Sequence, residues 1–327
     1  MIDFNANPLF LAPLAGYSDI ALRGVVKKFC CDVTTSEMIS ANALALGNKK
    51  TLKMLEKNSS ETPYIVQIMG GDEEMIKRAV LLLNEIDGID GIDLNCGCPV
   101  PKVVKQGAGS ALLLNYDKLK KVVETIKRYS NKRYTSVKVR LGFDKKEPDK
   151  IIEALNEFEL SYICMHARTR SGGYSSKVDY ECIKIAKELC KTKLIANGDI
   201  DKSNAAYVKE YTKADGLMIG RASIGQPWIF YEIKNGKNVS KELKNKIILY
   251  HYDEMLKYYG KSAVAIFRKH LHRYSKGLEG AALFRDEINK IQDEKSLREA
   301  INSFFSSANL ATQALNEPPA SEIKTLT

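Results

Sequence analysis

The chain has 327 residues, of which 44% are hydrophobic and 28% are charged, as in an ordinary globular protein with room for a barrel and a modest second unit. No apolar run approaches the roughly 20 residues of a membrane span, the N-terminus lacks a signal-peptide pattern, and seven cysteines without disulfide-scaffold density favour a reducing cytoplasm. The net charge of +10 favours polyanionic partners, while four scattered histidines and the lack of Cys-x-x-Cys predict no metal site.

Short apolar segments alternate with amphipathic, helix-like stretches over the first two thirds of the chain. The segments are 9–16, 33–40, 64–70, 91–99, 135–142, 162–169, 193–200 and 216–222. Strands that alternate with helices predict a parallel sheet, and this number of strands closes a (β/α)₈ TIM barrel. An open doubly wound sheet is the alternative, disfavoured because no Gly-x-Gly-x-x-Gly follows the first segment.

The pattern changes after Ile233. Residues 235–238 form a turn-rich linker, and residues 240–310 have helical periodicity without a strand pattern. We therefore expect an α/β fold with a catalytic TIM barrel at 1–233, a small all-α helical-bundle domain at 240–315, and a flexible tail at 316–327.

A thiol follows the fourth segment, where the chain reads Asn95-Cys96-Gly97-Cys98-Pro99. The C-terminal ends of barrel strands carry the chemistry of this fold. Most free thiols only pack in the core, but Gly97 permits close approach of a ligand and Pro99 stiffens the turn. We predict that Cys98 is catalytic, whereas Cys96 has no such turn beside it.

Polar residues recur at the other strand ends. They are Gln67, Lys138 with Arg140, His166 with Arg168, Asn197-Gly198-Asp199, and Gly220-Arg221. Buried without partners, such groups cost several kcal/mol, and each alone could be a rim or satisfied core residue. We expect Gly198 and Gly220 to expose N–H groups where a helix begins, with Arg221 beside them, which is how barrels hold phosphate. The pattern therefore predicts a phosphorylated planar cofactor, and FMN fits best.

In this order and spacing, the motifs resemble those of tRNA-dihydrouridine synthases over residues 9 to about 305. They are Ala12-Pro13, Ser36-Glu37-Met38, Gln67-Ile68, Asn95–Pro99, Lys138-Val139-Arg140, His166–Thr169, Asn197–Ile200, and Gly220-Arg221 with Pro227-Trp228. Residues 107–112, Phe267–His270, Tyr274 and Phe284-Arg285 most resemble the bacterial B-type branch.

The resemblance implies roles for individual residues. Under the FMN ring would lie Pro13, Leu14 and Ala15; Gln67, Lys138 and His166 would approach the ring. The ribityl phosphate would be held by Asn197, Gly198, Asp199, Gly220 and Arg221. Cys98 would be the general acid, Asn95 would grip the target uracil, and Lys102, Arg140 and Arg168 would face the tRNA.

Three positions depart from the family pattern. Leu14 and Cys96 stand where methionine is usual or frequent, and a second thiol makes disulfide or sulfenate chemistry conceivable for Cys96. Pro101 stands where B-type relatives commonly have lysine, which would alter one RNA contact while Lys102 remains.

Residues 258–276 are basic and contain no acidic side chain. On a helix, Lys261, Arg268, His272 and Lys276 would share one face, and Val264, Phe267, Leu271 and Tyr274 another. A solvated face is the simpler reading, but it would normally include glutamates. We expect Arg268, Lys269 and Arg273 to bind tRNA phosphates.

The leading hypothesis is an FMN-dependent reductase that converts a D-loop uridine of tRNA to 5,6-dihydrouridine with NADPH or NADH. Hydride from reduced FMN would reach C6, and a proton from Cys98 would reach C5. The expected partner is the tRNA D-arm, and the expected state is a cytoplasmic monomer without a metal or membrane contact. The alternatives are a flavin-dependent reductase or dehydrogenase of a free pyrimidine and a non-catalytic RNA-binding barrel.

Overall fold

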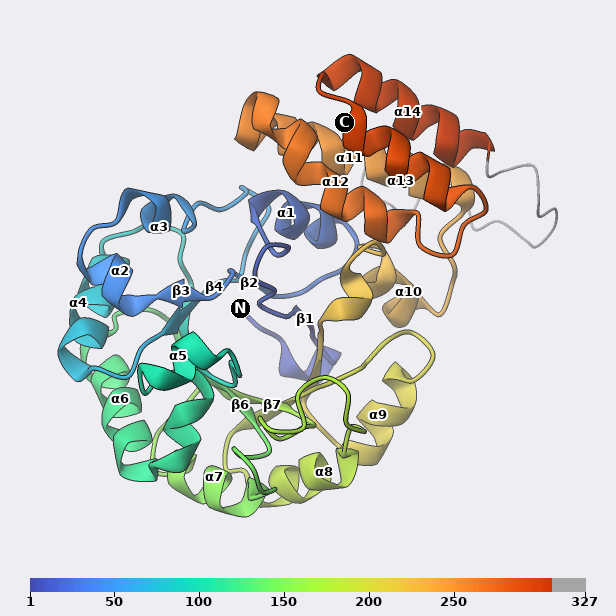
Figure 1. Ribbon diagram of the computed structural model, residues 1–327. Helices are drawn as coiled ribbons and strands as arrows, with labels where there is room; N and C mark the ends of the chain where they lie inside the picture. The colour runs from blue at the N-terminus through green and yellow to red at the C-terminus, as the bar shows by residue number, and fades with distance from the viewer. Residues whose placement is uncertain (308–327) are drawn as a thin grey trace.

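The computed structural model describes residues 1–307, and it contains a parallel barrel with helices around it (Figure 1). The strands are β1 (Leu9–Leu11), β2 (Thr34–Thr35), β3 (Ile39–Ser40), β4 (Tyr64–Met69), β5 (Gly91–Cys96), β6 (Tyr134–Arg140), β7 (Tyr162–His166), β8 (Lys193–Asn197) and β9 (Gly216–Ile219). Their order around the sheet is β1-β9-β8-β7-β6-β5-β4-β2, and every pairing is parallel. A bridge between Phe10 and Val33 joins the two ends. The predicted TIM barrel is confirmed.

One predicted strand is divided. Residues 33–40 were expected to form a single strand, but β2 and β3 pair with the two ends of β4 and leave residues 36–38 between them. At this interruption a side chain takes the place of the strand pairing. The Ser36 hydroxyl accepts a hydrogen bond from the Gln67 N–H in the middle of β4 (3.0 Å). Met38 in this interruption reaches the mouth of the barrel.

The helices of the barrel cover the sheet from outside. They are α1 (Ile20–Lys28), α2 (Ala41–Ala45), α3 (Lys49–Lys53), α4 (Glu73–Asn84), α5 (Pro101–Lys105), α6 (Tyr116–Tyr129), α7 (Pro148–Leu155), α8 (Tyr180–Leu189), α9 (Ala205–Thr212) and α10 (Ile229–Asn235), with 3₁₀ turns η1 (Phe4–Ala6), η2 (Gly109–Leu114) and η3 (Arg221–Ser223). Sequence signals set their starts: the carboxylate of Asp72 caps α4, and the amide of Asn115 caps α6. Amphipathic spacing sets their inner faces, as in α6, where Leu119, Val122 and Ile126 are buried.

Strand alternation gives the barrel interior two different levels. Residues at the N-terminal ends that face inward are apolar, such as Ile65, Tyr162 and Ile195. Successive inward positions lie two residues apart, so these strands go on to place Gln67, His166 and Asn197 at the C-terminal end. The apolar level closes the barrel from below, and the polar level forms the floor of its mouth.

The C-terminal region is helical and packs on the barrel. It contains α11 (Lys241–Tyr259), η4 (Gly260–Ser262), α12 (Ala263–Tyr274), α13 (Ala281–Lys290) and α14 (Glu294–Ser307). Its core includes residues of the barrel's outer layer, since Val25 of α1, Phe29 directly after α1, and Trp228 beside α10 belong to the same apolar cluster. Residues 308–315 of the predicted domain and the predicted tail at 316–327 lie outside the described residues. Within residues 1–307, every helix is too short or too polar to cross a bilayer.

The single helix predicted over 258–276 is wrong in its extent. Gly260, with φ +53°, ends α11, and α12 begins only at Ala263. Lys261 therefore lies in η4, and Lys276 lies beyond the end of α12. The predicted basic face thus loses two of its members from the helix.

Candidate active site

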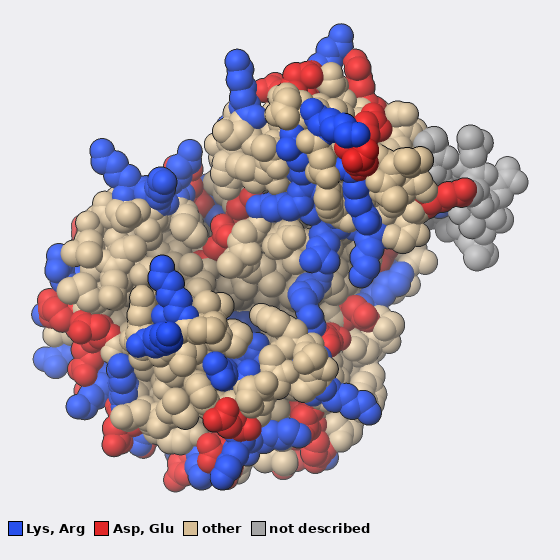
Figure 2. Space-filling view, in the orientation of Figure 1, with Lys and Arg blue, Asp and Glu red and all other residues tan. Residues whose placement is uncertain are grey.

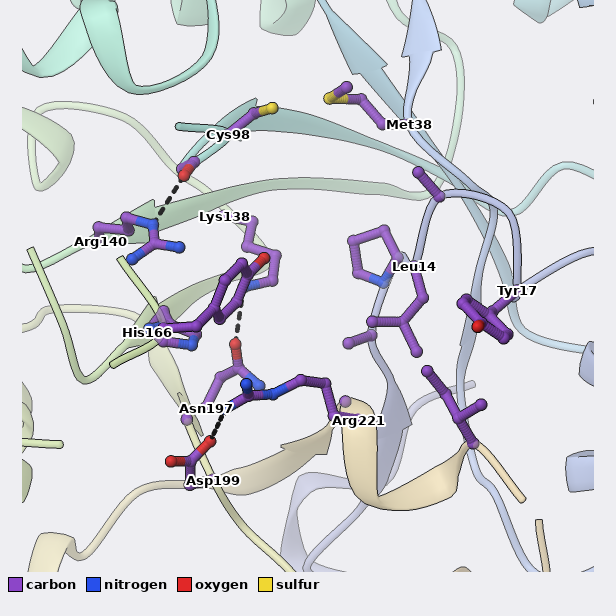
Figure 3. Close-up of a pocket in the computed structure, with 18 of the residues that line it drawn as sticks. Leu14, Tyr17, Met38, Cys98, Lys138, Arg140, His166, Asn197, Asp199 and Arg221 are labelled. Carbon is purple, nitrogen blue, oxygen red and sulfur yellow. Dashed lines mark hydrogen bonds and ion pairs between the residues drawn. The ribbon is translucent and has the colours of Figure 1, made fainter. Parts of the chain in front are cut away.

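A cavity of about 600 Å³ opens at the C-terminal ends of the barrel strands (Figure 3). It brings together most of the residues singled out in the sequence: Pro13, Leu14, Ala15, Gln67, Asn95, Cys98, Lys138, Arg140, His166, Asn197, Gly198, Asp199, Gly220, Arg221 and Arg273. Lys102, Arg168, Arg268 and Lys269 do not line it. Residues as far apart in the chain as Pro13 and Arg273 therefore meet in one site.

Cys98 lies at one end of the cavity, beside Met38 (Figure 3). Its backbone is fixed on both sides: the Cys98 N–H donates to Asn95 Oδ1 (2.9 Å), and the Cys98 carbonyl accepts from Ser110 Oγ (2.9 Å). Gly109 makes this approach possible, because it has φ +61° and a Cβ there would lie 3.0 Å from the Cys98 carbonyl oxygen. The loop thus holds the thiol in one place.

The thiol of Cys98 is partly buried, and burial raises its pKa above the ordinary value of 9.0, against the opposing effects of the Val100 N–H and the Arg140 guanidinium. The group is therefore protonated at neutral pH and can donate a proton. Cys96 differs, because it is the last residue of β5, faces away from its inward-facing neighbour Asn95, and is fully buried in the core between sheet and helices. Cys96 is a free thiol outside the cavity.

Lys138 and Asn197 form part of one wall, across the cavity from Leu14 (Figure 3). The Lys138 ammonium donates to Asn197 Oδ1 (2.8 Å), and the Asn197 amide donates to the Met218 carbonyl (2.8 Å). Burial lowers the pKa of Lys138. An ammonium held by one neutral oxygen can still donate to a ligand in the cavity.

His166 is neutral, because burial and the cations Lys138 and Arg140 lower its pKa to about 2. Its Nδ1 is buried and has no hydrogen-bond partner among the described residues. A buried polar atom without a partner is unfavourable, and this one belongs to a residue that lines the cavity. A polar group of a bound ligand would satisfy it.

Asp199 and Arg221 lie at the opposite end from Cys98 (Figure 3). The Asp199 carboxylate pairs with Arg221 and also with Arg168 (2.5 Å), and these cations lower its pKa. Arg221 remains half exposed and lines the cavity, whereas the carboxylate itself would repel an anion. Asp199 orients both arginines, and its predicted role at a phosphate stays a prediction.

The expected helix starts at this end are wrong in detail. After Gly198 the chain turns and α9 begins only at Ala205, while Gly220 precedes η3, a single 3₁₀ turn. Both glycines still line the cavity. A Cβ on Gly220 would lie 3.7 Å from Ala12 Cβ, in ordinary contact, so packing within the chain leaves space on this side. Any phosphate site here would use loop backbone and Arg221 rather than a long helix.

Two arginines that we expected to face tRNA are structural braces in this structure. Arg140 is 3% exposed and donates to the carbonyls of Gly97 (2.8 Å) and Thr169 (2.9 Å). Arg168 is 4% exposed and donates to the Ser176 carbonyl as well as to Asp199. Arg168 does not line the cavity, whereas Arg140 does.

Among the cavity residues that were not predicted as site residues are Tyr17, Met38 and Tyr174. All three lie in loops after strands, where apolar periodicity gives no signal. Tyr174 lies against the guanidinium groups of Arg140 and Arg221, at 5.4 and 4.9 Å from its ring centre. Met38 belongs to the motif Ser36-Glu37-Met38, whereas Tyr17 and Tyr174 carry no sequence signal of this kind.

The basic residues of α12 divide into two groups. The Lys269 ammonium lies over the ring of Tyr17 (5.5 Å), and Arg273 lines the cavity. Arg268 instead donates to the Ile291 carbonyl at the start of the loop after α13. Figure 2 shows Lys and Arg side chains along the boundary between the helical region and the barrel mouth. Lys102 is exposed on α5, outside the cavity.

Comparison with known proteins agrees with this geometry. The family model described as "Dihydrouridine synthase (Dus)" matches residues 10–309. A relative from Helicobacter pylori named "Probable tRNA-dihydrouridine synthase" is 46% identical over 316 residues, which cover 95% of this chain and 96% of the relative. "tRNA-dihydrouridine synthase B" of Pasteurella multocida is 34% identical over 311 residues, covering 91% of this chain and 93% of the relative.

Solved structures share the barrel. A structure titled "Crystal structure of TcOYE with pHBA" matches with a TM-score of 0.53 at 7% identity, covering 71% of this chain and 90% of that one. Morphinone reductase matches with a TM-score of 0.51 at 13% identity, covering 71% and 87%. These distant matches show the fold alone. The family match over nearly the whole chain, together with relatives above 30% identity, establishes that this chain belongs to the dihydrouridine synthase family and is an oxidoreductase of that family.

Proposed function

We propose that this protein reduces a D-loop uridine of tRNA to 5,6-dihydrouridine, using FMN and a nicotinamide dinucleotide, NADPH or NADH. One observation carries the proposal: a protonated thiol, Cys98, lies at one end of a cavity whose other groups suit a flat, anionic nucleotide. The names of the relatives supply the substrate class. A cytoplasmic location follows from that substrate.

The residues present fit FMN. Pro13, Leu14 and Ala15 offer an apolar surface for a flat ring, and Gln67 lies deeper in the cavity. The unpartnered Nδ1 of His166 and the ammonium of Lys138 could contact polar ring edges. The phosphate would lie toward Asn197, Gly198, Gly220 and Arg221, with Asp199 orienting the arginine. A cavity of about 600 Å³ has the size of ordinary cofactor sites.

When bound and reduced, FMN supplies the hydride that adds to C6 of uracil. Cys98 supplies the proton for C5, because its thiol is protonated at neutral pH and faces the cavity. Proton loss leaves a thiolate, which the Arg140 guanidinium and the Val100 N–H would stabilise, as both favour the charged form. Asn95 would hold the uracil.

Binding of tRNA is proposed at the boundary between the barrel and the helical region. Lys269 and Arg273 of α12 lie beside the cavity mouth and can bind phosphates while a uridine enters the cavity. Lys102 on exposed α5 is a further candidate contact. Arg268 is bound to the Ile291 carbonyl and is a weaker candidate. The arrangement gives a positively charged rim beside a partly apolar cavity. All of these contacts come from one copy of the chain.

The test uses the purified chain with FMN, unmodified tRNA transcript, and NADPH or NADH. We expect a yellow protein that oxidises the dinucleotide and produces dihydrouridine in the tRNA, detected by nucleoside mass spectrometry. Free uracil and orotate serve as competing substrates. Rapid reduction of a free pyrimidine without dihydrouridine in tRNA would overturn the proposal in favour of a pyrimidine reductase. A protein that binds tRNA but takes up no flavin would overturn it in favour of an RNA-binding barrel.

A further inference from the structure

A buried carboxylate, Asp93, lies beneath the cavity without lining it. The register places it between Gln67 of β4 and Ser136 of β6 on neighbouring strands. Asp93 Oδ2 accepts a hydrogen bond from Gln67 Nε2 (2.8 Å), and Asp93 Oδ1 accepts one from Ser136 Oγ (2.6 Å). All three side chains are at most 3% exposed. The mechanism above gives Asp93 no role.

The hydrogen bonds continue from Gln67 to the loop that carries the thiol. Gln67 Oε1 accepts from Asn95 Nδ2 (2.8 Å), and Asn95 Oδ1 accepts from the N–H groups of Gly97 (3.1 Å) and Cys98 (2.9 Å). A chain of side-chain amides therefore connects Asp93 with the backbone of the catalytic loop.

The groups at both ends of this row of hydrogen bonds determine which way the two side-chain amides are oriented. An amide can present either its oxygen or its nitrogen, but a backbone N–H only donates, so Asn95 must turn its oxygen toward Gly97 and Cys98. Its nitrogen then donates to Gln67 Oε1, and Gln67 Nε2 must find an acceptor. An ionised carboxylate is an acceptor only, and Asp93 provides it. Reversal would place oxygen against carboxylate at one end and N–H against N–H at the other.

Asp93 remains largely ionised at neutral pH. Burial raises its pKa to about 6, while the hydrogen bonds from Ser136 and Gln67 and the charge of Lys138 oppose this rise. Charge-assisted hydrogen bonds are roughly twice as strong as neutral ones. The carboxylate therefore contributes strongly to the orientation of the two amides.

We propose that Asp93 is a positioning residue, which acts through Gln67 and Asn95 to hold the Cys98 loop in the geometry for proton transfer. The inference rests on the proposed function, in that Cys98 is taken as the proton donor. It assigns no contact between Asp93 and substrate or cofactor. The same orientation leaves Asn95 with a remaining N–H, and no free oxygen lone pair, for a ligand in the cavity.

The test compares Asp93→Leu, which keeps the approximate size but removes the acceptor, with Asp93→Asn. Asparagine can accept from Gln67 with its oxygen and donate to Ser136 Oγ with its nitrogen, so it should rescue the arrangement. Ser136→Ala is the matched control, since it removes a neighbour of Asp93 and leaves the acceptor for Gln67. Flavin content and the midpoint of urea unfolding are measured for every variant.

Two activities and one chemical readout are measured. We expect Asp93→Leu to slow single-turnover reduction of tRNA uridine at least tenfold, while flavin reduction by NADPH stays within about threefold. Alkylation of Cys98 by iodoacetamide, followed by mass spectrometry without tRNA, should change at least threefold in Asp93→Leu. Asp93→Asn and Ser136→Ala should stay within about threefold of the wild type in all three.

Unchanged uridine reduction and unchanged Cys98 alkylation in Asp93→Leu would overturn the inference. So would an equal fall of both half-reactions in Asp93→Leu and Asp93→Asn, because that is the result of a general packing defect. If Asp93→Leu does not fold, Asp93→Asn combined with Ser136→Ala replaces it, and its effect should exceed the product of the two single effects. If wild type fails to reduce tRNA, the proposed function fails, and Cys98 alkylation still tests the positioning.

Discussion

Replacing Cys98 by alanine tests the proposed chemistry at its centre. The substitution removes a partly buried thiol that makes no side-chain hydrogen bond to another side chain among the described residues, while the backbone contacts of residue 98 to Asn95 and Ser110 remain. The loop should therefore keep its shape. The loss is limited to the proton donor on the cavity wall.

The magnitude follows from the protonation state of the thiol. Because burial raises its pKa above 9.0, essentially every molecule carries the proton at neutral pH, so the whole population is competent as an acid. Removal of a positioned general acid costs about 10²–10⁴ in rate, which corresponds to about 2.7–5.5 kcal/mol of transition-state stabilisation. Cys98→Ala should lose this factor in uridine reduction. The half-reaction in which NADPH reduces the flavin needs no proton at C5 and should be retained.

The pH dependence has a definite sign. A thiol acts as an acid in its protonated form, so the rate of uridine reduction should be level from neutral pH upward and fall only above the raised pKa of Cys98. Single-turnover mixing of reduced enzyme with tRNA, quenched and digested for nucleoside analysis, measures the rate at each pH. Cys96→Ala is the control; it should retain activity and lose about 1 kcal/mol of stability, because its thiol fills the core outside the cavity. Near wild-type dihydrouridine formation by Cys98→Ala would refute the reasoning.

Three further predictions concern other parts of the molecule. Arg221→Ala should weaken FMN binding about tenfold, since the half-exposed guanidinium would contribute near the lower end of the 1.5–3 kcal/mol of a charged hydrogen bond; fluorescence titration with an unchanged affinity would exclude Arg221 from the phosphate site. Lys269→Ala with Arg273→Ala should weaken tRNA binding and reduce its salt dependence, the slope of log K against log salt falling by about 1.4–1.8, while NADPH oxidation by the flavin persists; an unchanged slope would place the RNA surface elsewhere. Glu61→Gln should cost about 3–5 kcal/mol in urea unfolding, because it leaves the buried Arg23 guanidinium without its counter-ion; a loss below 1 kcal/mol would contradict this account.

The barrel and most of its site could be predicted because both depend on periodicity. Inward positions on a strand lie two residues apart, so Gln67, Lys138, His166 and Asn197 had to reach the same cavity once the strands were placed. Cys96 and Cys98 share the same parity, and what separates them is that β5 ends at Cys96. Cys98 lies in the loop at the mouth, and Cys96 points into the core between sheet and helices.

Side-chain partners could not be predicted, because they depend on contacts between distant segments. The sequence shows Asp199 beside a glycine at a strand end, but its pairing with Arg168 and Arg221 requires β7, β8 and η3 to be side by side. Arg140 and Arg168 were expected to face RNA because they are charged residues at strand ends of a chain that resembles the family. Backbone carbonyls of neighbouring loops bind both guanidinium groups instead.

Packing against α1, the first α-helix of the chain, determines where α12 and its basic residues lie relative to the cavity. In α1 every residue from Ile20 to Val26 is buried, Arg23 among them with its partner Glu61, so the helix is covered on all sides. Leu22 and Val26 pack toward the barrel, while Ala21 and Val25 belong to the core of the C-terminal helices. The helical region is thereby anchored on the barrel by apolar packing rather than only by the linker.

A second contact, between Gly225 and Arg273, brings α12 close to the strand-end loops beside the cavity. Gly225, in the loop after β9 and η3, has φ +81°, and a Cβ there would lie 2.7 Å from the Arg273 backbone carbonyl carbon and oxygen. Only glycine allows α12 to approach so closely. Because α1 fixes the helical region and Gly225 lets its basic helix touch the strand-end loops, Lys269 and Arg273 are held at the cavity mouth by the packed core. The backbone that carries the proposed phosphate contacts is therefore in place before RNA arrives, so binding has to order only the side chains.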